Sequence, residues 1–404
     1  MLKIVQTKEG KNYLVPFLLI TSLFFLWGFA HSILDVLNKH FQDAMEITKT
    51  RSALIQAVVY GGYFIMAIPA GQIIRKFGYR VGVITGLLLY GIGSLLFIPG
   101  SHLMSFNFFL FSLFVIGCGL TCLETAANPY VTILGDPETS AQRINLSQSF
   151  NGLGWICGPL VGGFFLFSGD ANIAAPYAII GVIVLIVAYA FSRIKLPEIG
   201  LEEEVKAEAV SVEHHRRLWQ IPTFMFGLLA LFLYVAAQTG INSFFINYVT
   251  ENVGITAGEA SLYLSFGGMG LFMAGRMGGS WVMKYIRPEK LLLLCALGAM
   301  IAMIAVINFS GKLGLYSFLF CFLCESIMFP TIFALAIKET GIYTKQASSY
   351  LIMSIVGGAI APLTMGYIAD HGTMAEGFCV PLVCFMAIGF FACLYKKMLL
   401  TLIK

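Results

Sequence analysis

Two acidic side chains, Asp35 and Glu124, lie inside long apolar stretches of the sequence. An ionisable side chain in the middle of a membrane span costs about 3 kcal/mol on insertion scales, so such residues mark functional sites by default. Burial favours the protonated form of a carboxyl group, which can then bind a proton near neutral pH and release it when its access to water changes. The two residues are therefore candidates for proton coupling.

Each of these carboxyl groups also has a structural explanation. Glu124 could instead hydrogen-bond a neighbouring helix, and Asp35, near the outer end of its predicted span, could extend into interfacial water. Asp35 follows His31 by four residues, so the two side chains share a helical face. Because a helix rises about 1.5 Å per residue, Asp35 is expected well above Glu124, and direct proton transfer between them would need water or helix bending.

Two further charged residues, Glu325 and Arg276, stand in apolar stretches of the second half. Glu325 and Glu124 each precede a proline by five residues, which makes them partners in an internal repeat. Glu325 is a candidate for substrate binding or a second coupling role, with a structural role as the alternative. Arg276 follows a glycine, and we expect it to serve as a structural or gate residue that pairs with a carboxylate or a helix end.

Amide and aromatic side chains near these charges suit a small hydroxylated ligand. An amide can bond two adjacent hydroxyl groups, and an aromatic ring can stack on the apolar face of a sugar. The amides recur at spacings of three or four, so they line single helical faces, although amides also hold membrane helices together. The candidate binding residues are Gln148, Asn151, Gln238, Asn242, Asn145, His31, Trp27, Tyr63 and Glu325.

The composition shows what must position these residues. Hydrophobic residues make up 58% of the 404 residues and charged residues 11%, whereas a soluble domain has about 25% charged residues. Apolar runs of about 20 residues recur along the chain, each long enough to cross a bilayer as a helix. We therefore predict an all-α integral membrane fold with twelve spans: 13–40, 52–75, 79–100, 105–135, 142–168, 174–194, 219–250, 257–286, 289–308, 313–339, 345–370 and 377–397.

The two halves of the chain repeat each other. FLWGFAHSILD, which ends at Asp35, aligns with FLYVAAQTGIN, which ends at Asn242, about half a chain later. Parallel repeats of six helices are typical of transporters whose halves rock about a central site. We predict a six-helix bundle at 1–194, a charged cytoplasmic linker at 195–218 and a second bundle at 219–404.

The distribution of charge orients the chain and excludes other classes. All but five of the 25 Lys and Arg residues fall in segments that are cytoplasmic if the N-terminus is cytoplasmic, so we expect both termini and the linker inside the cell. The net charge of +4 is small, and no basic cluster indicates nucleic-acid binding. The nine cysteines lie in or at the ends of apolar runs without a metal-binding spacing, so we expect no disulfide, metal site or prosthetic cofactor. No nucleophile or acid–base constellation indicates an enzyme.

Six segments together resemble the fucose:proton symporter family of the major facilitator superfamily: FFLWGFAHSILDVLNKHF, AGQIIRKFGYRVGVITGLLLY, CLETAANPYVTILG, RINLSQSFNGLG, YVAAQTGIN and FPTIFALAIKETG. The resemblance extends from about Tyr13 to Gly366. It implies uptake of a monosaccharide with a proton by alternating access, across a bacterial inner membrane. It also implies proton coupling at Asp35 and Glu124 and sugar binding at Gln148 and Asn151.

The chain departs from the family pattern at two places. It has His31 on the approach to Asp35, where the L-fucose permeases are rich in asparagine, and Glu325 replaces an uncharged residue. QTGIN also resembles a segment with which sugar porters hold hexopyranoses. We expect a monomeric L-fucose:proton symporter, with glucose or galactose as the alternative sugar. A drug-efflux antiporter, a sensor that does not transport, and coupling to sodium are further alternatives.

Overall fold

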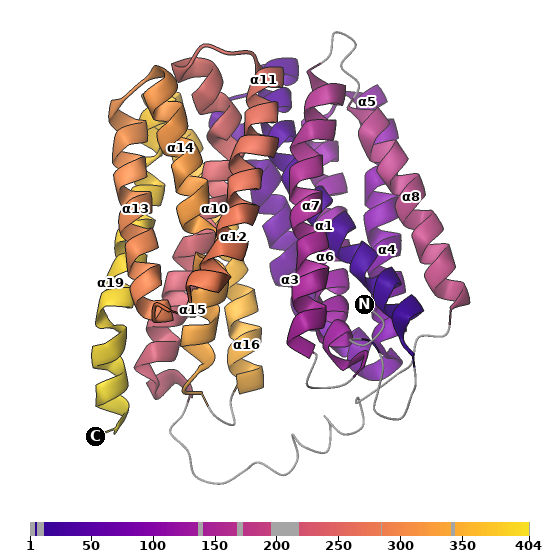
Figure 1. Ribbon diagram of the computed structural model, residues 1–404. Helices are drawn as coiled ribbons and strands as arrows, with labels where there is room; N and C mark the ends of the chain where they lie inside the picture. Colours follow the sequence, from indigo (N-terminus) through magenta and orange to yellow (C-terminus); the bar gives the residue numbers. More distant parts are fainter. Residues whose placement is uncertain are drawn as a thin grey trace. The chain divides into compact units, whose positions relative to one another are not determined.

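The computed structural model describes residues 5, 12–135, 140–167, 173–194, 218–283, 285–340 and 344–403, and these residues are almost entirely helical (Figure 1). The helices of the first half, in chain order, are α1 (Leu14–Met45), α2 (Lys49–Ser52), α3 (Leu54–Phe77), α4 (Tyr79–Leu95), α5 (Phe97–Leu103), α6 (Phe106–Ile133), α7 (Ser140–Leu166) and α8 (Ala174–Arg193).

The second half begins with the 3₁₀ turn η3 (Leu218–Gln220). The elements that follow are α10 (Pro222–Asn252), α11 (Ala257–Leu262), η4 (Tyr263–Met269), α12 (Gly270–Val282), α13 (Pro288–Asn308), α14 (Gly311–Glu325), α15 (Met328–Ile337), α16 (Thr344–Met353), η6 (Ser354–Val356), α17 (Gly357–His371), α18 (Met374–Gly377) and α19 (Cys379–Ile403).

Eleven helical segments of the described chain are long and apolar enough to cross a membrane. They coincide with eleven of the twelve predicted spans. The twelfth, 257–286, is the continuous run of α11, η4 and α12, in which η4 is a π-helical turn. The prediction of an all-α, multi-pass membrane protein is confirmed.

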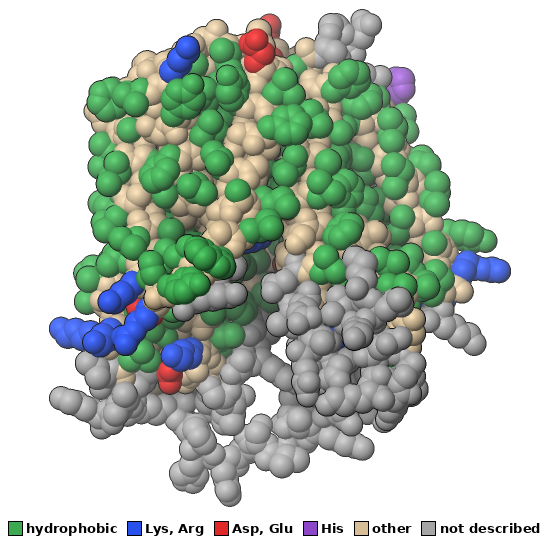
Figure 2. Space-filling view, viewed as in Figure 1, with side chains coloured by type: hydrophobic (Ala, Val, Ile, Leu, Met, Phe, Trp, Pro, Cys, Tyr) green, Lys and Arg blue, Asp and Glu red, His purple; other side chains and the backbone are tan. Residues whose placement is uncertain are grey.

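The surface agrees with a lipid environment. On the face drawn in Figure 2, hydrophobic side chains cover the middle of the described helices. Ile186 of α8 and Ile301 of α13 are 61% and 66% exposed, which a water-soluble protein would seldom allow for a whole belt of residues. The apolar exterior is thus the part that contacts lipid.

The chain forms two compact units. Unit 1 comprises Met1–Leu34 and Gly61–Val212, and unit 2 comprises Asp35–Tyr60 and Glu213–Lys404. The segment Asp35–Tyr60, called here the 35–60 hairpin, contains the end of α1, all of α2 and the start of α3. Our repeat-based division assigned this hairpin to the first bundle, whereas its contacts are with α10 and α17. The linker at 195–218 lies, except for its last residue, outside the described residues, and the division at that linker stays a prediction.

Close helix approach in unit 1 places α7 against α1. A Cβ atom added at Gly154 of α7 would overlap the backbone of Phe25 and Phe29 in α1, and one added at Gly28 of α1 would overlap the backbone of Asn151. Glycine therefore lets the two backbones touch, as small residues do at membrane helix contacts. This contact positions the polar face of α7 beside the part of α1 that carries Trp27 and His31.

Candidate functional site

A single hydroxyl group joins three of the predicted site residues in unit 1. The indole Nε1–H of Trp27 donates to the Tyr63 hydroxyl at 2.9 Å, and His31 Nε2 lies 2.9 Å from the same oxygen. The Glu124 carboxyl group lies close enough to the Tyr63 hydroxyl to interact with it. Residues from α1, α3 and α6 thus form one polar group, called here the Tyr63 cluster.

The proton count of the Tyr63 cluster depends on Glu124. A tyrosine hydroxyl can donate one hydrogen bond and accept two. If Glu124 is ionised, Tyr63 donates to it and accepts from Trp27 and from an Nε2–H of His31. If Glu124 is protonated and donates to Tyr63, the hydroxyl must turn and donate to an unprotonated His31 Nε2. A proton on Glu124 therefore changes the hydrogen bonding of His31 without any movement of the helices.

Aromatic and apolar groups surround the cluster. His31 stacks on Trp155 of α7, with ring centres 6.0 Å apart and planes at 13°. Trp27 and Glu124 line a small cavity, together with Leu23, Phe24, Leu123, Ala127 and Asn128. This cavity is too small for a sugar, so a sugar would meet the Glu124 carboxyl group, the Asn128 amide and the Trp27 indole only after the side chains move apart.

The predicted amides of α7 differ in their environments. Asn151 is buried, and its Nδ2 donates to the Phe24 carbonyl of α1 at 3.1 Å. This bond is the helix-joining role that was the alternative for this residue. Gln148 is half-buried on the same helix, whereas the side chain of Asn145 lies outside the described residues.

Asp35 belongs to unit 2 and is not a member of the Tyr63 cluster. Its side chain is 2% exposed, and Gln56 Nε2 donates to its Oδ1 at 3.1 Å. Its Oδ2 has no hydrogen-bond partner among the described residues. The interfacial position that the sequence allowed for Asp35 is therefore wrong for this structure, because the 35–60 hairpin encloses the carboxyl group instead of leaving it in water.

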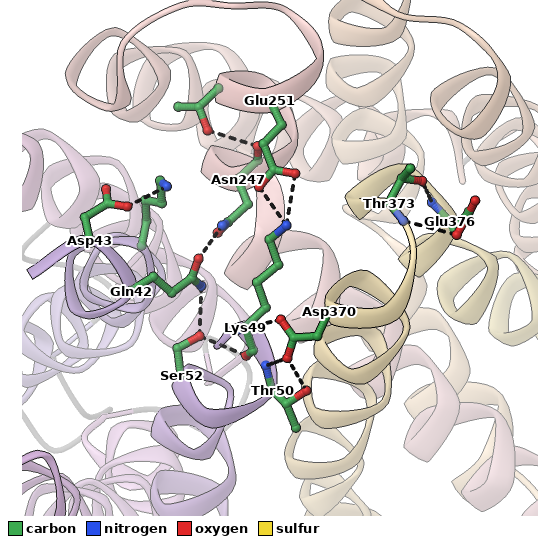
Figure 3. Close-up of polar contacts among 12 residues, drawn as sticks. Gln42, Asp43, Lys49, Thr50, Ser52, Asn247, Glu251, Asp370, Thr373 and Glu376 are labelled. Atoms are coloured by element: carbon green, nitrogen blue, oxygen red, sulfur yellow. Dashed lines mark hydrogen bonds and ion pairs between the residues drawn. The ribbon is translucent and has the colours of Figure 1, made fainter. Parts of the chain in front are cut away.

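Four polar residues of α10 stand at intervals of four and face the 35–60 hairpin. Because residues four apart share a helical face, they form one polar line along α10. Two contacts along this line are Thr239 Oγ1 to the Tyr60 hydroxyl at 3.1 Å and Asn38 Nδ2 to the Ser243 carbonyl at 2.7 Å. Figure 3 shows the other two, Asn247 Nδ2 to Gln42 Oε1 and Lys49 Nζ to Glu251 Oε1 at 2.8 Å.

A fifth contact joins the hairpin to α17. Asp370 accepts hydrogen bonds from the backbone N–H of Lys49 at 2.9 Å, the backbone N–H of Thr50 at 2.8 Å and the Thr50 hydroxyl at 2.6 Å (Figure 3). Gly366 of α17 permits this approach, since a Cβ there would lie 2.8 Å from the Lys49 backbone. The line on α10 and the Asp370 contacts are called here the hairpin clasp.

The predicted binding residues of α10 lie beside the clasp. Asn242 is 3% exposed, and its Oδ1 has no hydrogen-bond partner in the described part of the chain. Gln238 is half-buried. Asn242 thus keeps an acceptor available, while the ligand of either residue stays a prediction.

Arg276 of α12 lies against the end of α14, the helix that carries Glu325. Glu325, at the end of α14, is fully buried. Arg276 Nε of α12 donates to the Ser326 carbonyl at 3.3 Å, and its guanidinium lies 4.8 Å from the centre of the Phe272 ring. Arg276 therefore contacts a helix end, one of the two kinds of partner expected for it.

Sequence reasoning did not find the clasp residues Gln42, Lys49, Glu251 and Asp370. The four-residue spacing from Thr239 to Glu251 was a readable signal on the α10 side. The sequence did not show what this line contacts. No sequence pattern links the 35–60 hairpin to α10, and the two segments meet only in the folded chain.

The Major Facilitator Superfamily model matches residues 17–362. The chain is 38% identical to the L-fucose-proton symporter of Escherichia coli (strain K12), over 95% of this chain and 94% of the relative. It is 36% identical to the glucose/galactose transporter of Brucella abortus, over 97% of both chains.

A solved structure agrees with both sequence relatives. The crystal structure of a variant of the E. coli fucose:proton symporter superposes with a TM-score of 0.68 and 36% identity, covering 95% of this chain and 99% of that chain. The resemblance read from the six sequence segments is confirmed. The chain belongs to the Major Facilitator Superfamily, a family of membrane transporters and not of enzymes.

Proposed function

We propose that this protein is a secondary symporter that imports a monosaccharide together with protons by alternating access. The observation that carries the proposal is the Tyr63 cluster, in which a carboxyl group, a histidine and an indole converge on one hydroxyl. Two relatives of similar identity, an L-fucose-proton symporter and a glucose/galactose transporter, support it. We place the protein as a monomer in a bacterial inner membrane, with both termini and the linker in the cytoplasm.

Glu124 is the proposed proton carrier of unit 1. Protonation removes its charge and, by the hydrogen-bond count above, turns the Tyr63 hydroxyl toward His31. Trp27 keeps the hydroxyl oxygen in place in both states, because it donates to that oxygen in either case. Protonation of Glu124 would thus change which hydrogen-bond donors and acceptors Glu124 and His31 offer to a sugar hydroxyl. Such a difference in affinity is what allows a proton to favour sugar binding.

The proposed sugar site combines the Tyr63 cluster with amides. In unit 1 the proposed hydroxyl ligands are Gln148 and Asn145, and in unit 2 the candidates are Asn242 and Gln238. Asn151 has its Nδ2 committed to Phe24, so we assign it to positioning α7 as well as to binding. Trp27 and Trp155 are the proposed stacking surfaces.

L-fucose is the first candidate substrate, and glucose or galactose the second. The relatives named for these sugars differ by only two percentage points in identity, 38% against 36%. His31 is the chain's own feature at the site. Because its ring nitrogen can switch between donor and acceptor, His31 can accommodate either orientation of a sugar hydroxyl.

The hairpin clasp is the proposed outer closure. Charge distribution predicts that the 35–60 hairpin lies on the outer side of the membrane. For a sugar to enter from outside, the hairpin must separate from α10 and α17, which breaks the contacts of Tyr60, Asn38, Gln42, Lys49 and Thr50. Asp35 lies within the same hairpin, bonded to Gln56, and is exposed to outside water when the clasp opens. Asp35 is thus the proposed first proton acceptor from outside.

The test is radiolabelled L-fucose uptake into proteoliposomes under an inward proton gradient, with unlabelled glucose and galactose as competitors. We expect gradient-driven accumulation. Glu124→Gln should abolish accumulation while sugar exchange across the membrane persists, because exchange needs no net proton movement. Glu46→Gln, at an exposed carboxyl group of the 35–60 hairpin, is the matched control and should transport as the wild type.

The outcomes separate the alternatives. Undiminished accumulation by Glu124→Gln would refute the coupling role of Glu124. Uptake of glucose or galactose in place of L-fucose would select the second substrate. Outward movement of hydrophobic cations with no sugar uptake would replace symport with drug efflux.

A further inference from the structure

The helix that carries Glu325 is broken beside it. α14 ends at Glu325 and α15 begins at Met328, so two residues interrupt the span. A break frees backbone carbonyl groups that a continuous helix would satisfy. Here the Tyr234 hydroxyl donates to the Glu325 carbonyl at 3.0 Å and Arg276 Nε donates to the Ser326 carbonyl at 3.3 Å. Discontinuous helices of this kind form ion and substrate sites in transporters.

The carboxyl group at the break has no partner of its own. Glu325 is 0% exposed, and neither Oε1 nor Oε2 has a hydrogen-bond partner among the described residues. The two nearby donors, Tyr234 and Arg276, each bond a backbone carbonyl instead. An unpaired carboxylate in such a place would cost several kcal/mol, whereas a neutral carboxyl group needs no counter-ion.

The surroundings of Glu325 are few and can be named by element. α10 contributes Tyr234, which lies close enough to Glu325 and to Arg276 of α12 for their charges to act on it. α14 itself contributes Cys321 and Cys324, α3 contributes Tyr60 near Tyr234, and α13 contributes Cys295 near Cys324. Arg276 is the only permanently charged group in this set.

We propose that Glu325 is a second proton-binding site, located in unit 2, and that it carries one proton per sugar through the transport cycle. The step is the reversible addition of one proton to the carboxylate, with no other bond made or broken. This inference rests on the proposed proton-coupled transport and adds a site that the relatives' names do not describe. Glu325 would then serve unit 2 as Glu124 serves unit 1.

A proton fits this site better than a sodium ion. Sodium needs several oxygen ligands around it, and the two backbone carbonyls at the break are already bonded to Tyr234 and Arg276. No three His, Cys, Asp or Glu side chains gather anywhere in the described residues.

The first experiment observes the proton without transport. Infrared spectra of the purified, full-length protein, recorded over a pH series, show protonated carboxyl groups as a C=O band separate from the amide bands. Glu325→Gln should remove the contribution of one carboxyl group from this band at neutral pH. Glu46→Gln, a change at an exposed carboxyl group away from the helix break, should leave the band unchanged. An unchanged band in Glu325→Gln overturns the proposal.

The second experiment counts protons in the cycle. At a set proton-motive force, the limiting ratio of sugar inside to sugar outside equals the ratio for one proton raised to the power of the number of protons carried per sugar. If Glu325 carries one of two protons, Glu325→Gln should accumulate sugar only to the square root of the wild-type ratio, with exchange retained. An unchanged ratio overturns the coupling role. A wild-type ratio that follows a sodium gradient at fixed pH overturns the choice of proton.

The two experiments distinguish failure of this inference from failure of the proposed function. If the wild type accumulates no sugar under any gradient, symport is refuted, but the infrared band still decides whether Glu325 holds a proton. If Glu325→Gln does not fold, Glu325→Asp keeps the carboxyl group, and a band shifted in position supports the assignment. A band identical to wild type in Glu325→Asp overturns it.

Discussion

Asp370 binds Thr50 through both the backbone and the side chain: one carboxylate oxygen accepts the Thr50 N–H at 2.8 Å and the Thr50 hydroxyl at 2.6 Å. The other oxygen accepts the Lys49 N–H at 2.9 Å. A carboxylate with three donors from the start of a helix is a strong contact, since hydrogen bonds to charged groups are each worth about 1.5–3 kcal/mol. This pair ties the 35–60 hairpin to α17.

Replacing Asp370 by Asn should loosen the hairpin clasp. Loss of the charge weakens the bonds to the two backbone N–H groups, and a change of about 1.4 kcal/mol shifts a two-state equilibrium roughly tenfold toward the open form. The measurement is the rate of maleimide labelling at Ser243→Cys, a buried clasp position, in a background without native cysteines. We expect roughly tenfold faster labelling. Asp43→Asn, whose ion pair with Lys39 stays within the hairpin, is the control and should leave the rate unchanged.

Gly366→Ala tests the close approach instead of the charge. The added Cβ would lie 2.8 Å from the carbonyl carbon and oxygen of Lys49 and from Thr50 Cα, so the hairpin must move away. Overpacking of this kind costs about 1–3 kcal/mol. Labelling at Ser243→Cys should again accelerate. Gly270→Ala, where a Cβ meets no atom within 4 Å, should not change it, and equal rates in both variants would show that the hairpin does not depend on this contact.

The ion pair of Lys49 with Glu251 should contribute less. It lies at the edge of the clasp, with the two side chains 19% and 37% exposed, and exposed pairs are worth about 0.2–1 kcal/mol. A double-mutant cycle of Lys49→Gln and Glu251→Gln, read by the same labelling rate, should give a coupling of at most about fivefold that declines with added salt. A coupling as large as the effect of Asp370→Asn would mean that α10, and not α17, makes the main contact with the hairpin.

Tyr63→Phe tests the centre of the Tyr63 cluster. The variant keeps the ring but removes the hydroxyl that Trp27, His31 and Glu124 share. Proton-driven sugar accumulation should be lost, because no hydroxyl group connects Glu124 with His31 in the variant. For the same reason, sugar binding should depend less on pH. Tyr90→Phe is the matched control: it removes another buried hydroxyl of unit 1, bonded to the Leu26 carbonyl, and should accumulate sugar normally. A Tyr63→Phe variant with wild-type pH dependence would exclude the relay through His31.

The spans could be predicted from the sequence because a span depends only on the length and hydrophobicity of one continuous segment. Apolar length alone sets where a helix crosses a bilayer, so eleven predicted spans reappear in the structure and the twelfth is present with a π turn. Glu124 and Tyr63 could be chosen for the same reason: a polar side chain in an apolar run stands out without any knowledge of its neighbours.

The clasp and the helix break could not be predicted in this way. Asp370 lies at the end of a span, where acidic residues are common. Its role in holding the hairpin is apparent only from its hydrogen bonds with Lys49 and Thr50 in the folded chain. The sequence allows Asp35 either a proton-coupling role or, as the alternative, an interfacial position in water, and only the fold shows that its carboxyl group is enclosed and bonded to Gln56. The break after Glu325 has a proline signal, because Pro330 lacks the N–H that would bond the Ser326 carbonyl. The same spacing of Glu124 and Pro129 leaves α6 continuous, so the proline alone did not predict the break.

The π turn at Tyr263–Met269 lets this helix carry one residue of extra chain length. A π turn holds one residue more than an α turn, so it absorbs a one-residue insertion inside a helix. Deleting a single residue from this turn would therefore return it to α geometry while Arg276 still faces the Ser326 carbonyl. Deleting a residue from the regular part of α12 before Gly275 would instead rotate Arg276 and Gly275 by about 100°, away from the Ser326 and Leu323 carbonyl groups. The π turn is thus the place where this span can change its length by one residue without changing the direction of its charged side chain.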